Sequence, residues 1–155
     1  MFKTLCRLTP LLLWTATAIG AQPVDLSGDW HLNVEKSRWS EMRKPVSVVV
    51  RIQHREPSLS YSGEVLYANE DVRDFAFEGA IDGKEYPMDR SFGSGKIVMK
   101  RVDFTTVESV MKSDDGKYVE SARTSVAQDG RTMTRRLRLQ SPEGVKTWIE
   151  VYEKR

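Results

Sequence analysis

The sequence has few of the residues that build metal centres and covalent active sites. It contains one cysteine, Cys6, and two histidines, His31 and His54. These cannot form a zinc cluster or a Cys/His catalytic pair, although a single imidazole with carboxylates could still bind a metal or haem. No serine lies in a Gly-x-Ser-x-Gly motif, and no glycine-rich phosphate loop precedes a helix. We therefore expect no metal and no cofactor, and the sequence names no catalytic residue.

The sequence also lacks an apolar run long enough to cross a membrane. The stretch Leu8–Ile19 is broken by threonines and a proline, and it falls short of the roughly 20 residues that a spanning helix needs. It follows Lys3 and Arg7 and ends on small residues, an arrangement typical of a secretory signal. We expect residues 1–21 to be a cleaved signal peptide and residues 22–155 to form one periplasmic or secreted domain without a membrane anchor.

Neither sign of charge is in excess once that segment is removed. The chain has 24 Lys+Arg and 22 Asp+Glu, and the loss of Lys3 and Arg7 leaves 22 of each sign. A domain without a positive field gives no reason to expect nucleic-acid binding. Because Cys6 is lost as well, the domain has no disulfide, so burial and backbone hydrogen bonds must hold it together.

Apolar and polar residues alternate through most of the domain, the pattern of half-buried strands. Turn signals separate these runs at Asp82-Gly83, Asp115-Gly116, Asp129-Gly130 and Glu143-Gly144. The expected strands are 28–35, 45–54, 58–68, 72–81, 95–102, 105–112, 117–127, 132–140 and 145–153. Consecutive strands with short connections predict an all-β fold, an up-and-down antiparallel β-barrel. Closing the sheet into a barrel pairs the backbone N–H and C=O groups that its two edge strands would otherwise leave free. An open β-sandwich is the alternative.

Gly28-Asp29-Trp30 opens the first expected strand and resembles the first-strand motif of lipocalins and fatty-acid-binding proteins, the calycin group. Through the segments 27–33, 35–37, 82–87, 129–134 and 151–154, the chain is similar to small exported bacterial lipocalin-like proteins of largely uncharacterised function. The resemblance implies that Trp30 plugs the closed end of the barrel under a basic side chain, Lys154 or Arg155. Gly28 lets the backbone pack tightly there.

Aromatic residues and arginines on the expected strands form the candidate ligand site. An arginine directed into a barrel must pair with an internal carboxylate, such as Glu120 or Glu150, or await an anionic ligand. Fatty-acid-binding barrels use interior arginine with tyrosine in the second way. The candidate ligand-binding residues are therefore Tyr61, Phe75, Phe77, Arg101, Arg123 and Tyr152. Placement of the arginines on the solvated outer face is the alternative, and the same question applies to Arg135.

These residues favour a barrel that binds a small hydrophobic or amphipathic molecule. Two alternatives remain open: an enzyme that catalyses an isomerisation or cyclisation, and a structural barrel without a ligand. A buried pair of a tyrosine and a carboxylate beside an open cavity would favour the enzyme, and a filled interior would favour the structural barrel. His54, flanked by polar residues, is expected to be solvated, and His31 is expected to face outward. The sequence contains no signal for an oligomeric state.

Overall fold

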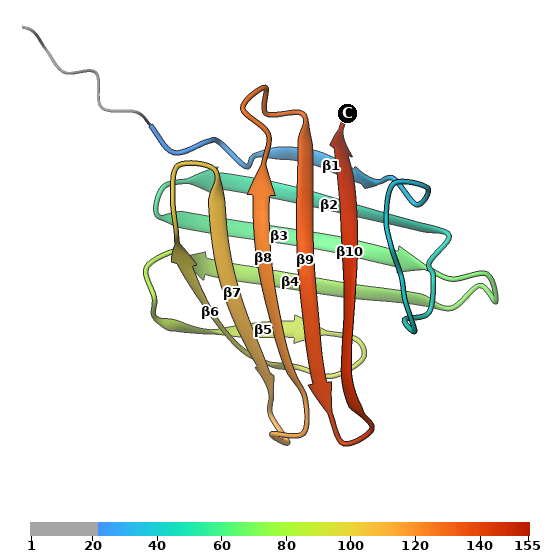
Figure 1. Ribbon diagram of the computed structural model, residues 1–155. Coiled ribbons are helices and arrows are strands. Elements are labelled where there is room, and N and C mark those ends of the chain that lie inside the picture. The colour runs from blue at the N-terminus through green and yellow to red at the C-terminus, as the bar shows by residue number, and fades with distance from the viewer. Residues whose placement is uncertain (1–21) are drawn as a thin grey trace, which may run out of the picture.

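The computed structural model describes residues 22–155, which form ten antiparallel strands and no α-helix (Figure 1). The strands are β1 (Gly28–Leu32), β2 (Ser47–Arg55), β3 (Ser58–Leu66), β4 (Val72–Ala80), β5 (Glu85–Arg90), β6 (Gly95–Arg101), β7 (Thr106–Ser113), β8 (Val119–Val126), β9 (Thr132–Ser141) and β10 (Gly144–Lys154). Each strand pairs with the next, and β1 also pairs with β10, so the sheet closes. The predicted all-β, up-and-down antiparallel barrel is confirmed. The predicted signal peptide, residues 1–21, lies outside the described residues.

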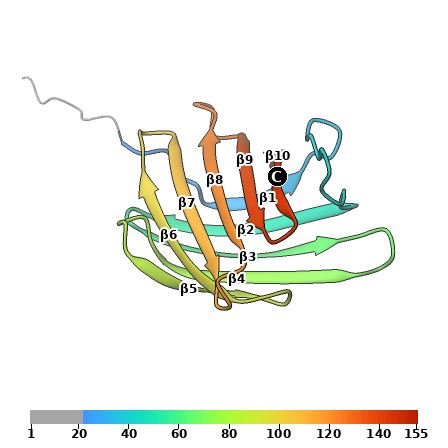
Figure 2. The same ribbon diagram turned by 60° about the horizontal axis from the view of Figure 1, so that its bottom comes forward.

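The barrel has two layers of strands that cross each other. Figures 1 and 2 show β7–β10 running steeply in front of β1–β4, while β5 and β6 join the two layers. Because the strands alternate in direction, their connections gather at two ends. We call one the sealed end, where the turns after β2, β4, β6 and β8 lie beside residues 22–27. The other, the loop end, has the long β1–β2 connection, residues 33–46, and the remaining turns.

Alternate side chains of each strand point into the barrel and form its core. The main core consists of Leu26, Trp30, Val48, Val50, Leu59, Phe77, Ile81, Met88, Ile97, Met99, Val107, Met111, Val126, Met133 and Tyr152. A smaller cluster on β8–β10 contains Ala122, Leu137 and Trp148. Trp39 and Met42 of the long loop pack against this smaller cluster, so the loop covers part of the loop end.

The four turn glycines have the backbone conformation that the sequence predicts. One strand, β5, is absent from the predicted set. Gly83, Gly116, Gly130 and Gly144 all have positive φ angles, as hairpin turns of this kind require. Strand β5 is absent from the expected set because it is short and contains Pro87, which cannot donate to a hydrogen-bond ladder. The first strand also ends at Leu32, earlier than expected, because the chain turns immediately after Asn33.

Trp30 plugs the sealed end, as predicted. Its side chain is completely buried, and its Nε1–H donates to the carbonyl of Leu26 at 2.8 Å. Lys154 covers the ring, with Nζ 5.0 Å from the ring centroid. Gly28 has a φ of 130°, and a Cβ atom there would lie 2.9 Å from Cε of Lys154. Of the two basic residues considered, Lys154 is therefore the cover, while Arg155 is exposed and bonds the carbonyl of Asp29 through its backbone N–H.

Candidate functional site

Three of the expected ligand-binding residues form one aromatic group inside the barrel. Tyr61 on β3 stacks with Phe77 on β4 at a centroid distance of 5.1 Å and meets Phe75 edge-on at 6.1 Å. Phe75 lies directly opposite Gly63, and a Cβ atom at Gly63 would come within 2.3 Å of the Phe75 ring. The glycine therefore allows the ring to lie across the neighbouring strand.

A polar centre lies beside this aromatic group, on β9 and β10. Arg135 and Glu150 are direct partners in the strand register, and Nη1 of Arg135 donates to Oε2 of Glu150 at 3.1 Å. The hydroxyl of Tyr152 donates to the same oxygen at 3.0 Å, and Nε1–H of Trp148 donates to Oε1 at 2.9 Å. Glu150 thus accepts three hydrogen bonds, which offset the cost of placing its charge inside the barrel.

The environment fixes the protonation states of this centre. Burial raises the pKa of Tyr152 well above its ordinary value, and the negative charge of Glu150 raises it further. Burial likewise raises the pKa of Tyr61. Burial disfavours the charged form of Arg135, but the nearby groups, Glu150 foremost and then Tyr152, Glu120 and Tyr61, together outweigh this effect and raise the pKa of the guanidinium. At neutral pH both tyrosines are therefore hydrogen-bond donors, and Arg135 is charged.

The polar centre is charge-balanced and partly accessible. A second ion pair joins Nη1 of Arg90 to Oε2 of Glu120 at 3.5 Å, so two arginines face two carboxylates. Arg135 and Glu120 keep 26% and 25% of their side-chain surface exposed, although both belong to inward-facing positions. Space for water-sized molecules therefore remains beside them. Along β9, Arg135 lies between Met133 of the main core and Leu137 of the smaller cluster, so apolar surface adjoins it on both sides.

Arg101 lies on the inner face of β6, as expected, but at the sealed end and away from the polar centre. Its guanidinium pairs with Glu56 and lies within 3.5 Å of Nε2 of His54. Its Nη1 atom is buried without a hydrogen-bond partner among the described residues. Burial alone would raise the pKa of Glu56, but hydrogen bonds from Arg101 and His54 outweigh burial and hold this pKa below its ordinary value. Arg101 therefore helps to close the barrel end.

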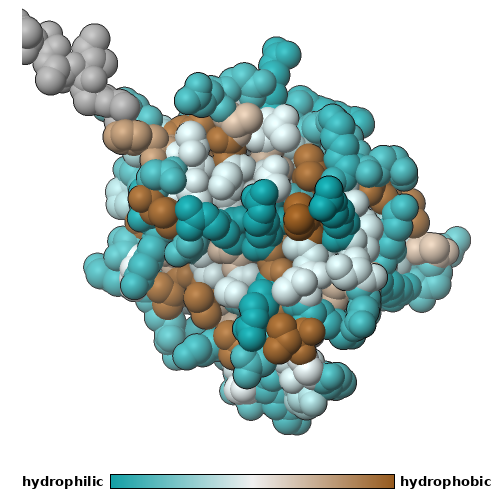
Figure 3. Space-filling view, viewed as in Figure 1, coloured by the Kyte–Doolittle hydropathy of each residue, from teal (hydrophilic) through white to brown (hydrophobic). Residues whose placement is uncertain are grey.

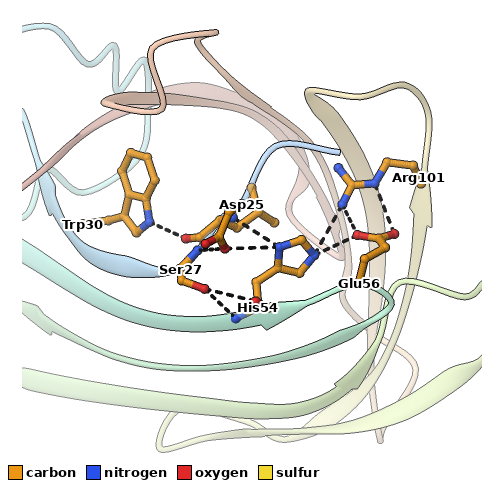
Figure 4. A network of polar contacts seen from close by, with 7 residues as sticks. Asp25, Ser27, Trp30, His54, Glu56 and Arg101 are labelled. Atoms are coloured by element: carbon orange, nitrogen blue, oxygen red, sulfur yellow. Dashed lines mark hydrogen bonds and ion pairs between the residues drawn. The ribbon is translucent and has the colours of Figure 1, made fainter. Parts of the chain in front are cut away.

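His54 belongs to the same network (Figure 4), and the expectation that it is solvated is wrong. Only 3% of its side chain is exposed. Its Nδ1 accepts the backbone N–H of Leu26 at 3.2 Å, and its Nε2 contacts Oε2 of Glu56 at 2.8 Å. The backbone N–H of His54 donates to Oγ of Ser27 at 2.9 Å. The polar residues that flank His54 in the sequence suggested an exposed side chain, but the N-terminal segment, residues 22–27, covers it.

Arg123 points away from the interior, so its candidate role as a ligand-binding residue inside the barrel is wrong and the outer-face placement is the correct one. On β8 the buried residues are Ala122 and Val126, which places Arg123 on the outer face. Its side chain is 48% exposed and pairs with Glu108 of β7. Arg135 occupies the interior instead. Its position on the face of Met133 and Leu137 was the available signal, and its partner is Glu150, one of the two carboxylates that the sequence suggested.

Within the described part of the chain, no three histidine, aspartate or glutamate side chains lie together closely enough to hold a metal ion. Among residues 22–155, no helix is long and apolar enough to cross a bilayer.

No protein-family model matches this chain, and a search of curated proteins gave no match. Solved structures do resemble it. The zebrafish ileal bile acid-binding protein, complexed with cholic acid, gives a TM-score of 0.59 at 14% identity, over 83% of this chain and 98% of that one. A fatty acid binding protein of Schistosoma mansoni, complexed with arachidonic acid, gives 0.60 at 13% identity, over 88% and 99%. The chain thus has the calycin fold of fatty-acid-binding proteins.

Proposed function

We propose that this protein is an exported barrel that binds one small amphipathic molecule in its interior, with the polar group of the ligand at Arg135. The supporting observation is the state of this side chain. Arg135 points inward and uses one of its N–H donors on Glu150, yet 26% of its side chain stays accessible. Donors therefore remain for a ligand, and the apolar residues on both sides suit a hydrocarbon body.

The charge balance of the polar centre defines the preferred head group. Glu150 accepts a hydrogen bond from Arg135 at 3.1 Å, so a ligand carboxylate beside Arg135 would also meet this negative charge. A hydroxyl or carbonyl oxygen would accept the same hydrogen bond without that repulsion. We therefore expect neutral amphipathic molecules to bind at least as tightly as fatty acids. Of the two roles considered for an interior arginine, the pair with Glu150 supports the internal carboxylate rather than an anionic ligand.

Displacement of a neutral fluorescent probe, phenylnaphthylamine, tests this proposal. Lauryl alcohol should displace the probe from the wild type at least as well as lauric acid. Arg135→Met should weaken binding of the alcohol by about tenfold or more, the loss expected for a hydrogen bond from a charged donor. Arg123→Met is the matched control, since it makes the same change on the outer face, and it should leave the affinity unchanged.

Removal of Arg135 alone leaves Glu150 without its cationic partner, which destabilises a fold. The double variant Arg135→Met/Glu150→Gln removes both charges and keeps the measurement possible if the single variant fails to fold. Native mass spectrometry of protein purified from its own host gives independent support if a ligand is retained. A wild type that binds no probe and retains no ligand would refute the proposal.

One observation favours a second candidate, an enzyme that uses Tyr152 and Glu150 as an acid/base pair. The two groups are hydrogen-bonded at 3.0 Å, and burial raises the pKa of the tyrosine. However, Tyr152 is only 2% exposed, and Glu150 already accepts three hydrogen bonds, so neither is free to exchange a proton with a ligand. Ligand binding is therefore the better supported function. Conversion of a retained ligand to an isomer, followed by NMR and lost in Tyr152→Phe, would reverse this ranking.

A further inference from the structure

A hollow of about 510 Å³ lies outside the barrel, over the outer face of β7–β10. This face is turned toward the viewer in Figures 1 and 3, and strongly hydrophilic side chains cross its middle next to apolar ones. We call the hollow the outer groove. The lining residues that matter for its chemistry are Arg38, Glu108, Arg123, Arg136, Arg138 and Ile149.

The strand register brings the arginines of the outer groove together. Arg123 and Arg136 are direct partners across β8 and β9, and Ile149 pairs with Arg136 on one side and with Arg38 on the other. Arg138 follows Arg136 on the same face of β9, two residues further along. Like charges placed directly opposite each other destabilise a sheet unless an opposite charge lies between them. The row therefore concentrates positive charge without an evident structural benefit.

Few negative charges of the protein balance this row. Glu108 is the acidic residue that lines the groove, and it pairs with Arg123. Within residues 22–155, Arg38, Arg136 and Arg138 take part in no ion pair. Three guanidinium groups therefore face one hollow with their charges uncompensated, although the domain as a whole is expected to be neutral.

We propose that the outer groove is a second binding site, for a phosphate-bearing anion with at least two negative charges. Guanidinium groups bind phosphate oxygens through paired hydrogen bonds, and several unpaired arginines in one row fit a ligand with closely spaced charges. The volume is that of a small-molecule site, and Ile149 offers an apolar wall. A free phosphate compound and a phosphate headgroup present the same chemistry to this row. The proposal does not depend on a ligand inside the barrel.

Calorimetric titration with inorganic pyrophosphate at low ionic strength tests the proposal. The wild type should bind, and Arg136→Gln/Arg138→Gln should weaken binding at least tenfold. Arg51→Gln/Arg55→Gln is the matched control, because it removes two positive charges from exposed positions on β2. The control should change the affinity by less than about twofold, since screened charges far from the ligand contribute little. Circular dichroism of both variants establishes that they fold.

Vesicle flotation distinguishes the two sources of phosphate. Phosphatidylcholine vesicles with and without phosphatidic acid present the headgroup, and binding that requires phosphatidic acid and is lost only in Arg136→Gln/Arg138→Gln supports a lipid ligand. Binding of pyrophosphate without binding of these vesicles supports a free phosphate compound. Equal weakening by the groove variant and its control would overturn the proposal, as would a wild type that binds neither pyrophosphate nor vesicles.

Discussion

Replacing Trp30 by alanine tests how far the plug at the sealed end stabilises the barrel. The indole is completely buried, and removal of a large buried aromatic side chain costs about 3–5 kcal/mol. The change also leaves the carbonyl of Leu26 without the hydrogen bond from Nε1 and removes the contact with Lys154, so we expect the upper part of that range. The domain has a total stability on the order of 5–15 kcal/mol, so this is a large part of it. Urea denaturation followed by circular dichroism measures the loss.

Trp30→Phe is the matched control, because it keeps a buried ring but removes the N–H donor. It should cost about 1–2 kcal/mol, the value of one buried hydrogen bond together with a small loss of packing. A loss below about 1 kcal/mol for the alanine variant would show that the ring does not plug the barrel. Equal losses for the two variants would show that the hydrogen bond, and not the burial of the ring, stabilises the sealed end.

Two further predictions concern charged groups. The pKa of Glu56 is held below 4.5, so its carboxylate stabilises the fold at neutral pH and loses this contribution as the pH falls below 4.5. Urea denaturation at about pH 7 and about pH 3 should therefore show a smaller loss for Glu56→Gln than for the wild type, and parallel losses would contradict this. Arg136→Thr relieves the opposition to Arg123 and should raise the free energy of unfolding by about 0.2–1 kcal/mol. A lower free energy of unfolding would show that the two arginines do not oppose each other.

Most of the fold could be predicted because it depends on local patterns. Alternation of apolar residues and glycines at tight turns indicate strands and hairpins directly, and consecutive strands imply closure. Strand β5 was not predicted because Pro87 argues against a strand. The segment is a strand because it pairs with β4 and β6, which its own sequence does not indicate. The plug at Trp30 was predictable from the resemblance, which implies both the buried indole ring and the basic side chain that lies over it.

The site was harder to predict because it depends on which face of a strand points inward. Strand β8 has polar residues on both faces, so its alternation does not reveal that Ala122 and Val126 are the buried positions and Arg123 is not. For His54 a signal existed: it shares the face of Val50 and Ile52, which points into the barrel. The cover supplied by residues 22–27 comes from a distant part of the chain, and no local pattern indicates it.

Closure of the barrel has a consequence for the order in which the chain can fold. Strand β1 pairs with β10, and the side chains of Asn33 and Glu153, 120 residues apart, hydrogen-bond across that junction. A chain that emerges from its N-terminus cannot complete this pairing until the last strand is free. Until then β1 and β9 each present an unpaired edge, and such edges invite pairing with other chains. Closure of the barrel is therefore the slow step, because it joins the residues furthest apart in the sequence. A chain shortened by one strand cannot close, and we expect it to remain an aggregation-prone open sheet.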